Sequence, residues 1–223
     1  MSEPASDPYA QDKAEILEAA LIEADFDGWS LETLRRAADK AGVSREIQRL
    51  AFPRGVMDLV GYYSEAMDQA MAAALAERDL SAMKVREKIA LGVRLRIEAL
   101  GAHKHAAYRA LRFLALPVFA GEGVKLVYRT VDRIWRECGD QSTDFNFYTK
   151  RALLAGVYTT TLMHWLDDDS EGGAATWELL ARRIDQVMRI EKVKAAVRRG
   201  LKGLPSPLKV LGVLRYPDRT RSH

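Results

Sequence analysis

The sequence has a single cysteine, Cys138, and no long apolar run. One cysteine cannot form an internal disulfide or a cysteine-rich zinc site, so a reducing compartment is the natural setting, and we expect Cys138 to be a small buried apolar residue. No stretch approaches the roughly 18 consecutive apolar residues of a membrane-spanning helix. The opening residues, MSEPASDPYAQDKAEI, lack the apolar core of a signal peptide and the arginine-rich pattern of a transit peptide. We therefore expect a cytoplasmic or mature protein that meets lipid only from outside.

The residue sets of common catalytic sites are also missing. We find no phosphate-binding glycine loop, no nucleophile elbow and no Glu-x-x-His pair of the di-iron type. His103 and His105 lie two residues apart on a predicted helix, so their side chains diverge. His164 is isolated and His223 ends the chain. The acidic run 167–169 lacks the spacing of a calcium site and predicts a solvated loop. We expect a protein that is not an enzyme and holds no metal or cofactor.

Charge is distributed unevenly along the chain, although the net charge is only +3. From Arg189 to Arg221 there are ten Lys/Arg and two Asp/Glu, a balance of +8, which leaves −5 on the first 188 residues. A basic end on a mildly acidic body indicates an anionic target, either a membrane or a nucleic acid.

Strand signals are nearly absent, whereas apolar residues recur with helical spacing throughout, so the sequence predicts an all-α fold. Ser30 and Ser44 are expected N-caps of two short helices. We expect helices over 12–24, 31–40, 45–51, 56–79, 82–101, 104–116, 121–138, 144–166 and 174–203. Two of them show an apolar face, formed by Val85, Ile89, Val93, Ile97 and Leu100 in one and by Val124, Val127, Val131, Ile134 and Cys138 in the other. The predicted parts are a head at 1–60, a helical body at 61–188 and a basic segment at 189–223.

The head has a helix-turn-helix layout, with the sequence AGVS between two helices. Over residues 10–60 it resembles TetR-type regulators, which makes a ligand-responsive transcriptional repressor the alternative hypothesis. Two features oppose this. The first 60 residues contain seven Lys/Arg and twelve Asp/Glu, which disfavours phosphate contacts. TetR heads usually carry a threonine and two aromatics in the reading helix, where this chain has Ile47, Arg49 and Leu50. We expect no binding to nucleic acid.

Residues 139–153 read GDQSTDFNFYTKRAL, an unusual polar and aromatic segment. Its acidic and hydroxyl side chains are suited to cap a helix start, and capping alone is one interpretation. Four successive residues of a helix point in all directions, so Phe145 and Phe147 cannot both enter one core face. We expect at least one aromatic side chain to be exposed or to lie at an interface.

This segment resembles the signature of the ubiquinone-biosynthesis accessory family called coenzyme Q biosynthesis protein nine. FPRG at 52–55 and TWELLARR at 176–183 agree with it, and the likeness spans roughly residues 14–203. It implies a TetR-like fold without DNA binding, and we expect a homodimer. It also implies an apolar cavity for an isoprenoid quinone or other lipid, which we expect among the helices of 82–101, 104–116, 121–138 and 144–166. It further implies a docking patch for the demethoxyubiquinone hydroxylase. The patch would comprise Asp140, Gln141, Ser142, Asp144, Phe145, Asn146, Phe147, Tyr148 and Arg151. Phe147 stands where the family commonly has tryptophan.

The basic end predicts an amphipathic helix. Its apolar face comprises Ile190, Val193, Val197, Leu201 and Leu204. Its basic residues include Lys192, Lys194, Arg198, Arg199 and Lys202. This pattern is typical of a helix that lies in a membrane interface, and the family's last helix is similar to it. An ordinary helix packed on the body is the alternative.

Overall fold

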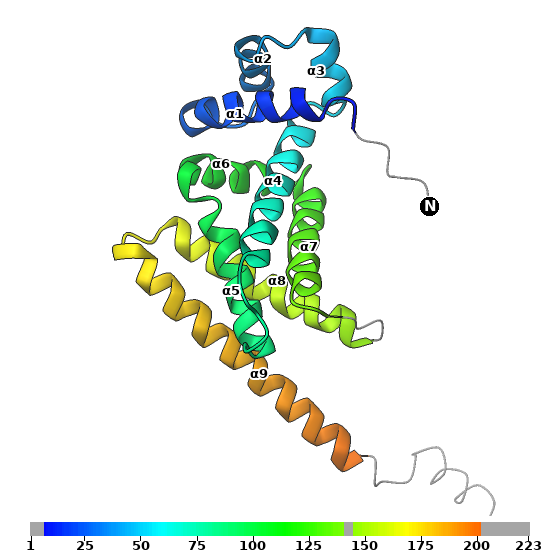
Figure 1. The fold of residues 1–223 in the computed structure, drawn as a ribbon, viewed down its shortest axis with the longest axis vertical. Helices are drawn as coiled ribbons and strands as arrows, with labels where there is room; N and C mark the ends of the chain where they lie inside the picture. The colour runs from blue at the N-terminus through cyan, green and yellow to red at the C-terminus, as the bar shows by residue number, and fades with distance from the viewer. Residues whose placement is uncertain (1–6, 141–144, 202–223) are drawn as a thin grey trace, which may run out of the picture. The chain divides into compact units, whose positions relative to one another are not determined.

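The computed structural model describes residues 7–140 and 145–201, and every regular element in those ranges is a helix (Figure 1). The helices are α1 Ala10–Asp27, α2 Leu31–Lys40, α3 Arg45–Ala51, α4 Val56–Ala76, α5 Val85–Glu98, α6 Lys104–Leu114, α7 Ala120–Glu137, α8 Phe145–Leu166 and α9 Ala174–Leu201. Short 3₁₀ turns lie at Gly101–His103 and Glu171–Gly173. The all-α prediction is confirmed. The chain divides into two compact units, Met1–Ala181 and Arg182–His223.

The head helices begin where the sequence predicts. The Ser30 hydroxyl accepts a hydrogen bond from the Thr33 amide at 3.0 Å, and Ser44 accepts one from the Ile47 amide at 3.3 Å. Each bond satisfies an amide in the first turn of a helix that has no partner within the helix. Between the two helices, Gly42 has a φ of +69°, which a glycine adopts without strain.

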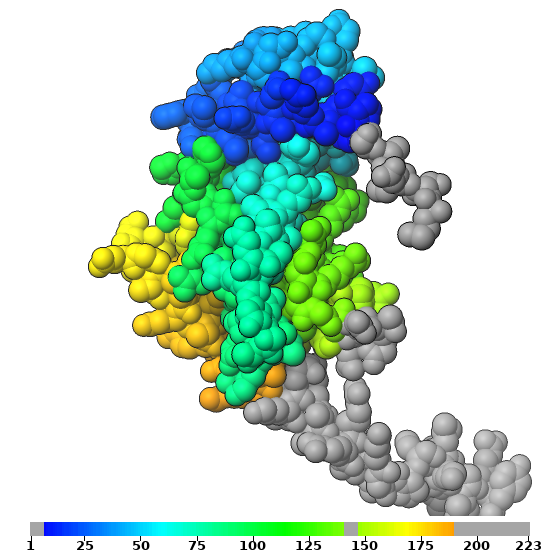
Figure 2. Space-filling view, viewed as in Figure 1, coloured from blue at the N-terminus to red at the C-terminus, as the bar shows by residue number. Residues whose placement is uncertain are grey.

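The head is fixed to the body through Trp29, which precedes α2. Its indole nitrogen donates to the Ala106 carbonyl of α6 at 2.9 Å, and its ring stacks on Tyr63 of α4 with centres 5.3 Å apart. The Ala106 amide in turn donates to the Asp25 carboxylate at 2.7 Å. As a result α1 lies directly against α4 and α6, as the space-filling view shows (Figure 2).

In the body, α4 packs against α5 and α7, and α8 packs against α7 and α5. The predicted apolar faces are largely correct, since Ile89, Val93, Ile97, Leu100, Val131 and Ile134 are buried. The prediction is wrong for Val85 and Val124, whose side chains are 57% and 70% exposed. Val85 is the first residue of α5 and Val124 the fifth of α7. A side chain at Gly92 would lie 2.9 Å from Ile134, so glycine allows α5 and α7 to approach closely.

Candidate functional site

An apolar cavity of about 80 Å³ lies inside the body, among α4, α5, α6, α7 and α8. Leucine, valine and alanine side chains form most of its wall: Val60, Leu100, Ala107, Ala110, Leu111, Leu114, Leu126, Val127 and Leu162. The sequence predicts a cavity among the four later helices. The contribution of α4 was missed, because no pattern in its sequence distinguishes a cavity wall from ordinary core.

One end of this cavity is polar and is built on a buried ion pair. Arg96 of α5 donates through Nε to Asp68 of α4 at 2.5 Å, and through Nη2 to the Ser64 hydroxyl at 3.2 Å. Thr130 of α7 donates to the two Asp68 carboxylate oxygens at 2.9 and 3.1 Å. Arg96 and Asp68 are 3% and 8% exposed, so solvent barely screens the pair. Tyr63 completes this end of the cavity.

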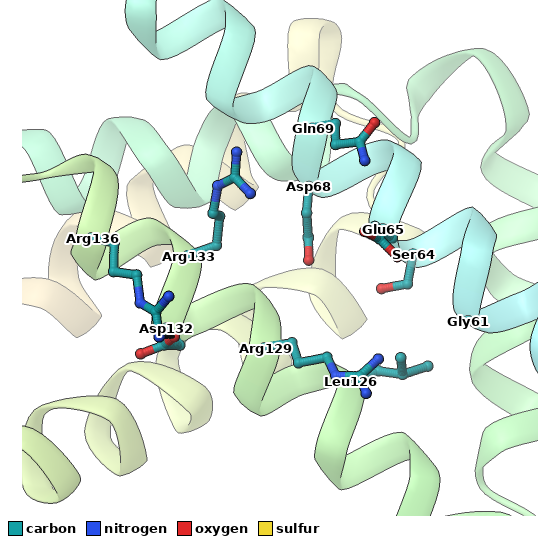
Figure 3. A pocket seen from close by; sticks show the side chains of 10 residues that line it. All are labelled: Gly61, Ser64, Glu65, Asp68, Gln69, Leu126, Arg129, Asp132, Arg133 and Arg136. Carbon is teal, nitrogen blue, oxygen red and sulfur yellow. Dashed lines mark ion pairs between the residues drawn. The ribbon is translucent and has the colours of Figure 1, made fainter. Parts of the chain in front are cut away.

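A larger groove of about 350 Å³ lies between α4 and α7 and is lined by charged residues (Figure 3). Arg129, Arg133 and Arg136 project from α7, whereas Glu65, Asp68 and Gln69 come from α4. Two of its arginines are paired, Arg136 with Asp132 at 2.8 Å and Arg133 with Glu137 at 2.6 Å. Such a lining is unsuited to an apolar guest despite its volume, because the guest would strip water from charged groups.

Of the two aromatic side chains that the structure describes at the start of α8, one is exposed. Tyr148 is 66% exposed, whereas Phe147 is half-buried and meets Tyr148 edge to face at 5.1 Å. Beneath Phe147, the Arg151 guanidinium lies 3.4 Å from the ring centre. Arg151 also donates to Asp132 of α7 at 2.6 Å and to Asp140 at 3.2 Å. These contacts anchor the start of α8 to α7 and leave Tyr148 facing outward.

The predicted docking patch is therefore only partly a surface. Arg151 is 1% exposed and the Asp140 side chain 6%, so both act inside the fold, and their prediction as surface contacts was wrong. Because both charges are largely shielded from water, removal of either partner would leave the other buried without compensation. Gln141, Ser142 and Asp144 lie outside the described residues. Phe145 and Asn146 form the first turn of α8, with side chains that are likewise outside the description.

The predicted membrane segment begins as a continuation of α9, whose backbone remains helical through Leu201. Lys202 and Leu204 lie outside the described residues, as do the side chains of Ile190, Val193, Lys194, Val197, Arg198, Arg199 and Leu201. Within the described ranges, no helix combines the length and apolar character needed to cross a bilayer.

His103, His164 and Asp168 have structural partners. His103 lies 3.4 Å from Asp25, and His164 hydrogen-bonds Thr176 at 3.1 Å. Hydrogen bonds from Ser170 and Thr176 hold the pKa of Asp168 well below its usual range. No group of three or more His, Cys, Asp or Glu side chains in the described part of the chain is arranged to hold a metal ion.

Burial raises the pKa of Cys138 to about 11. The thiol is only half-buried, so the prediction of a buried Cys138 was partly wrong. It lies just beyond Glu137, the last residue of α7.

Known proteins resemble this chain in both fold and sequence. A crystal structure of a TetR transcriptional regulator from Nitrosomonas europaea superposes with a TM-score of 0.63, covering 81% of this chain and 98% of that one. At 20% identity the likeness shows the fold alone, which is TetR-like.

The sequence comparisons are more specific. The model of the COQ9 family matches residues 120–191. The rat protein named "Ubiquinone biosynthesis protein COQ9, mitochondrial" is 31% identical over 209 residues, which cover 88% of this chain and 67% of the rat protein. The human protein of the same name is 30% identical, with coverages of 88% and 66%, and the Drosophila melanogaster protein 30%, with 80% and 56%. The chain thus spans just over half of the fly relative and about two thirds of the mammalian ones. With this identity along most of its length, the chain belongs to the COQ9 family.

Proposed function

We propose that this chain is a non-enzymatic lipid-binding accessory protein of ubiquinone biosynthesis. It takes an isoprenoid quinone intermediate into the body cavity at a membrane surface and presents it to the demethoxyubiquinone hydroxylase. The names of its relatives support the pathway. The observation that carries lipid binding is the cavity itself, since its apolar wall is drawn from five helices of the body.

The chemistry of the wall suits an isoprenoid chain. Moving one methylene from water into such a wall contributes about 0.8 kcal/mol, so a few isoprene units supply substantial affinity. The cavity of about 80 Å³ is smaller than the roughly 150 Å³ that admits a benzene ring. A guest must therefore move side chains apart. The half-buried apolar residues of the wall, Leu111, Leu114, Val127 and Leu162, are the ones with room to move.

The partner surface centres on Tyr148. An exposed tyrosine beside a second aromatic is typical of the few residues that dominate interface affinity. Arg151 and Asp140 serve this surface from inside, by holding Phe147 and the first turns of α8 on α7.

The basic segment at 189–223 contacts the membrane. Each basic residue near an anionic leaflet contributes on the order of 1 kcal/mol, so the balance of +8 over 189–221 supplies a strong attraction. The apolar residues of the same segment, which recur at spacings of three and four, supply insertion into the headgroup layer.

Lipid mass spectrometry after native purification tests the proposal. An isoprenoid quinone is expected to co-purify with the wild-type protein. Ala110→Leu places a larger side chain in the cavity wall and is expected to abolish co-purification. The matched control Ala70→Leu, at an exposed position of α4, is expected to retain it. Equal quinone content in the two variants, or none in the wild type, contradicts the proposal.

A TetR-type repressor is the second candidate, favoured by the fold. The contacts of α3 count against it, because Arg45 is paired with Asp39 at 2.7 Å and Gln48 is buried. A gel-shift assay at moderate salt decides between the two. We expect no sequence-specific shift. A specific shift that falls steeply with salt and is lost in Arg49→Ala favours the repressor instead.

A further inference from the structure

Two buried donors without a partner line the apolar cavity. Among the described residues, the Tyr63 hydroxyl and the Arg96 Nη1 are both shielded from solvent and form no hydrogen bond. Both residues are 3% exposed and both belong to the cavity wall. Unsatisfied buried polar atoms are uncommon in folded proteins because they lose their hydrogen bonds to water and gain nothing in return. Two of them in one small cavity are available to donate to a guest.

The fold holds both donors in place. Arg96 is fixed through its other two nitrogens, which donate to Asp68 and Ser64, so Nη1 is the one left without an acceptor. The Tyr63 ring is stacked on Trp29, which is itself held by its hydrogen bond to the Ala106 carbonyl. Neither side chain can turn to another acceptor without breaking these contacts.

Charge defines the kind of acceptor that fits. The Arg96 cation is already balanced by Asp68, so the cavity presents hydrogen-bond donors with little net charge. Burial raises the pKa of Tyr63, which keeps its hydroxyl protonated and able to donate at neutral pH. A neutral carbonyl or hydroxyl oxygen matches these donors. A pure hydrocarbon leaves them unsatisfied, and an anion would face the Asp68 carboxylate close behind Arg96.

The cavity also has a direction. At its polar end Tyr63 and Arg96 are each 3% exposed, whereas Leu111, Leu114 and Val127 at the apolar end are half-exposed. Beyond that end, the corner between α6 and α7 carries exposed apolar side chains, namely Leu116, Val118 and Val124. A guest with one polar and one apolar end therefore fits with its oxygens inward and its chain leading out across this corner.

We propose that Tyr63 and Arg96 recognise a carbonyl or hydroxyl oxygen on the head group of the bound isoprenoid, which enters the cavity head first and leaves it when the quinone passes to the hydroxylase. The inference rests on the proposed function and adds the residues that distinguish an oxygenated lipid from a hydrocarbon.

Calorimetric titration with two probes tests it. One probe is a 1,4-benzoquinone that carries a farnesyl chain, and the other is farnesene, which has the chain without the oxygens. Tyr63→Phe removes the hydroxyl and keeps the ring on Trp29, so it is expected to weaken quinone binding by about three- to tenfold, as loss of one hydrogen bond predicts. Binding of farnesene should not change. Because that hydroxyl has no partner in the free protein, the variant should unfold at the same urea concentration or a higher one.

Tyr128→Phe, at a partly exposed site on α7, is the matched control and should bind both probes as the wild type does. Arg96→Lys keeps a cation facing Asp68 but lacks the third nitrogen, and is expected to lose quinone affinity selectively. If Tyr63→Phe and Arg96→Lys bind the quinone as tightly as the wild type, or if the wild type does not prefer it to farnesene, the inference is overturned while lipid binding stands. Failure of the wild type to bind either probe overturns the proposed function as well.

Discussion

Replacing Arg96 by methionine should reveal how strongly the body depends on its buried ion pair. Methionine matches the apolar part of arginine but leaves Asp68, at 8% exposure, with Thr130 as its one remaining hydrogen-bond donor in the described structure. Two unit charges about 4 Å apart interact by about 4 kcal/mol at an effective dielectric constant near 20. Measured costs of breaking buried pairs are about 3–5 kcal/mol. We expect Arg96→Met to lower the free energy of unfolding by a similar amount.

A second substitution separates the loss of attraction from the stranded charge. Asp68→Asn in the Arg96→Met background removes that charge and keeps an oxygen that accepts from Thr130. The double variant is therefore expected to recover about 2 kcal/mol relative to Arg96→Met alone, since residues in direct contact couple by amounts of this order.

Urea denaturation followed by circular dichroism at 222 nm measures all three stabilities. Arg133→Met is the matched control, because Arg133 pairs with Glu137 at 2.6 Å on α7 and is 45% exposed. Exposed pairs contribute about 0.2–1 kcal/mol, so this variant should be nearly as stable as the wild type. The reasoning is refuted if Arg96→Met loses no more stability than Arg133→Met. It is also refuted if the double variant is less stable than Arg96→Met alone.

Three other predictions concern the partner surface, the membrane segment and the thiol. Tyr148→Ala should weaken binding to the hydroxylase about tenfold or more and change unfolding by only about 0.5 kcal/mol, because the ring is 66% exposed; a large loss of stability with unchanged binding assigns the ring to the core. Truncation after Met188 removes the +8 segment and should abolish sedimentation with anionic vesicles. Binding of the full chain to these vesicles should weaken as the salt concentration rises. Val197→Asp with Leu201→Asp should be as damaging as truncation, and unchanged binding contradicts interfacial insertion. Finally, burial raises the pKa of Cys138 to about 11 from 9.0, so its thiolate fraction at pH 8 is about a hundredfold lower than in ordinary cysteine. Alkylation by iodoacetamide should be slower by that factor and speed up about tenfold per pH unit as the thiol ionises; a rate like that of free cysteine contradicts the burial.

Local signals in the sequence were sufficient for the helices. Ser30 and Ser44 start helices because a hydroxyl next to an amide without a partner is a local arrangement, set within three residues. Periodicity also identified most of the buried faces. It failed at Val85 and Val124 because spacing reports which residues share a helical face, and not how far along the helix a neighbour covers that face.

The candidate site was harder to predict, since its polar residues come from distant parts of the chain. Asp68 and Arg96 are separated by 28 residues, and Asp68 and Thr130 by 62. Nothing in the sequence near Arg96 distinguishes it from a surface arginine on an amphipathic helix. Because a partner on another helix is not apparent from the local sequence, the burial of Arg151 was also not predicted, and the family resemblance placed this residue in a docking patch. Its partner Asp132 lies on the preceding helix and draws it inside.

Tyr63 joins the cavity to the head, and this contact bears on both candidate functions. The ring forms part of the cavity wall on one side and stacks on Trp29 on the other, so a guest at the polar end reaches the residue that fixes the head to α6. In a ligand-responsive repressor, such a contact would transmit binding to the DNA-reading helix. A change in Trp29 fluorescence on binding is therefore expected under either function and does not discriminate between them. The charge of the head does discriminate, because twelve acidic and seven basic residues within 60 positions oppose the approach to phosphate whatever the cavity holds. A link between cavity and head is thus no evidence of DNA binding, since the same contact also stabilises the fold.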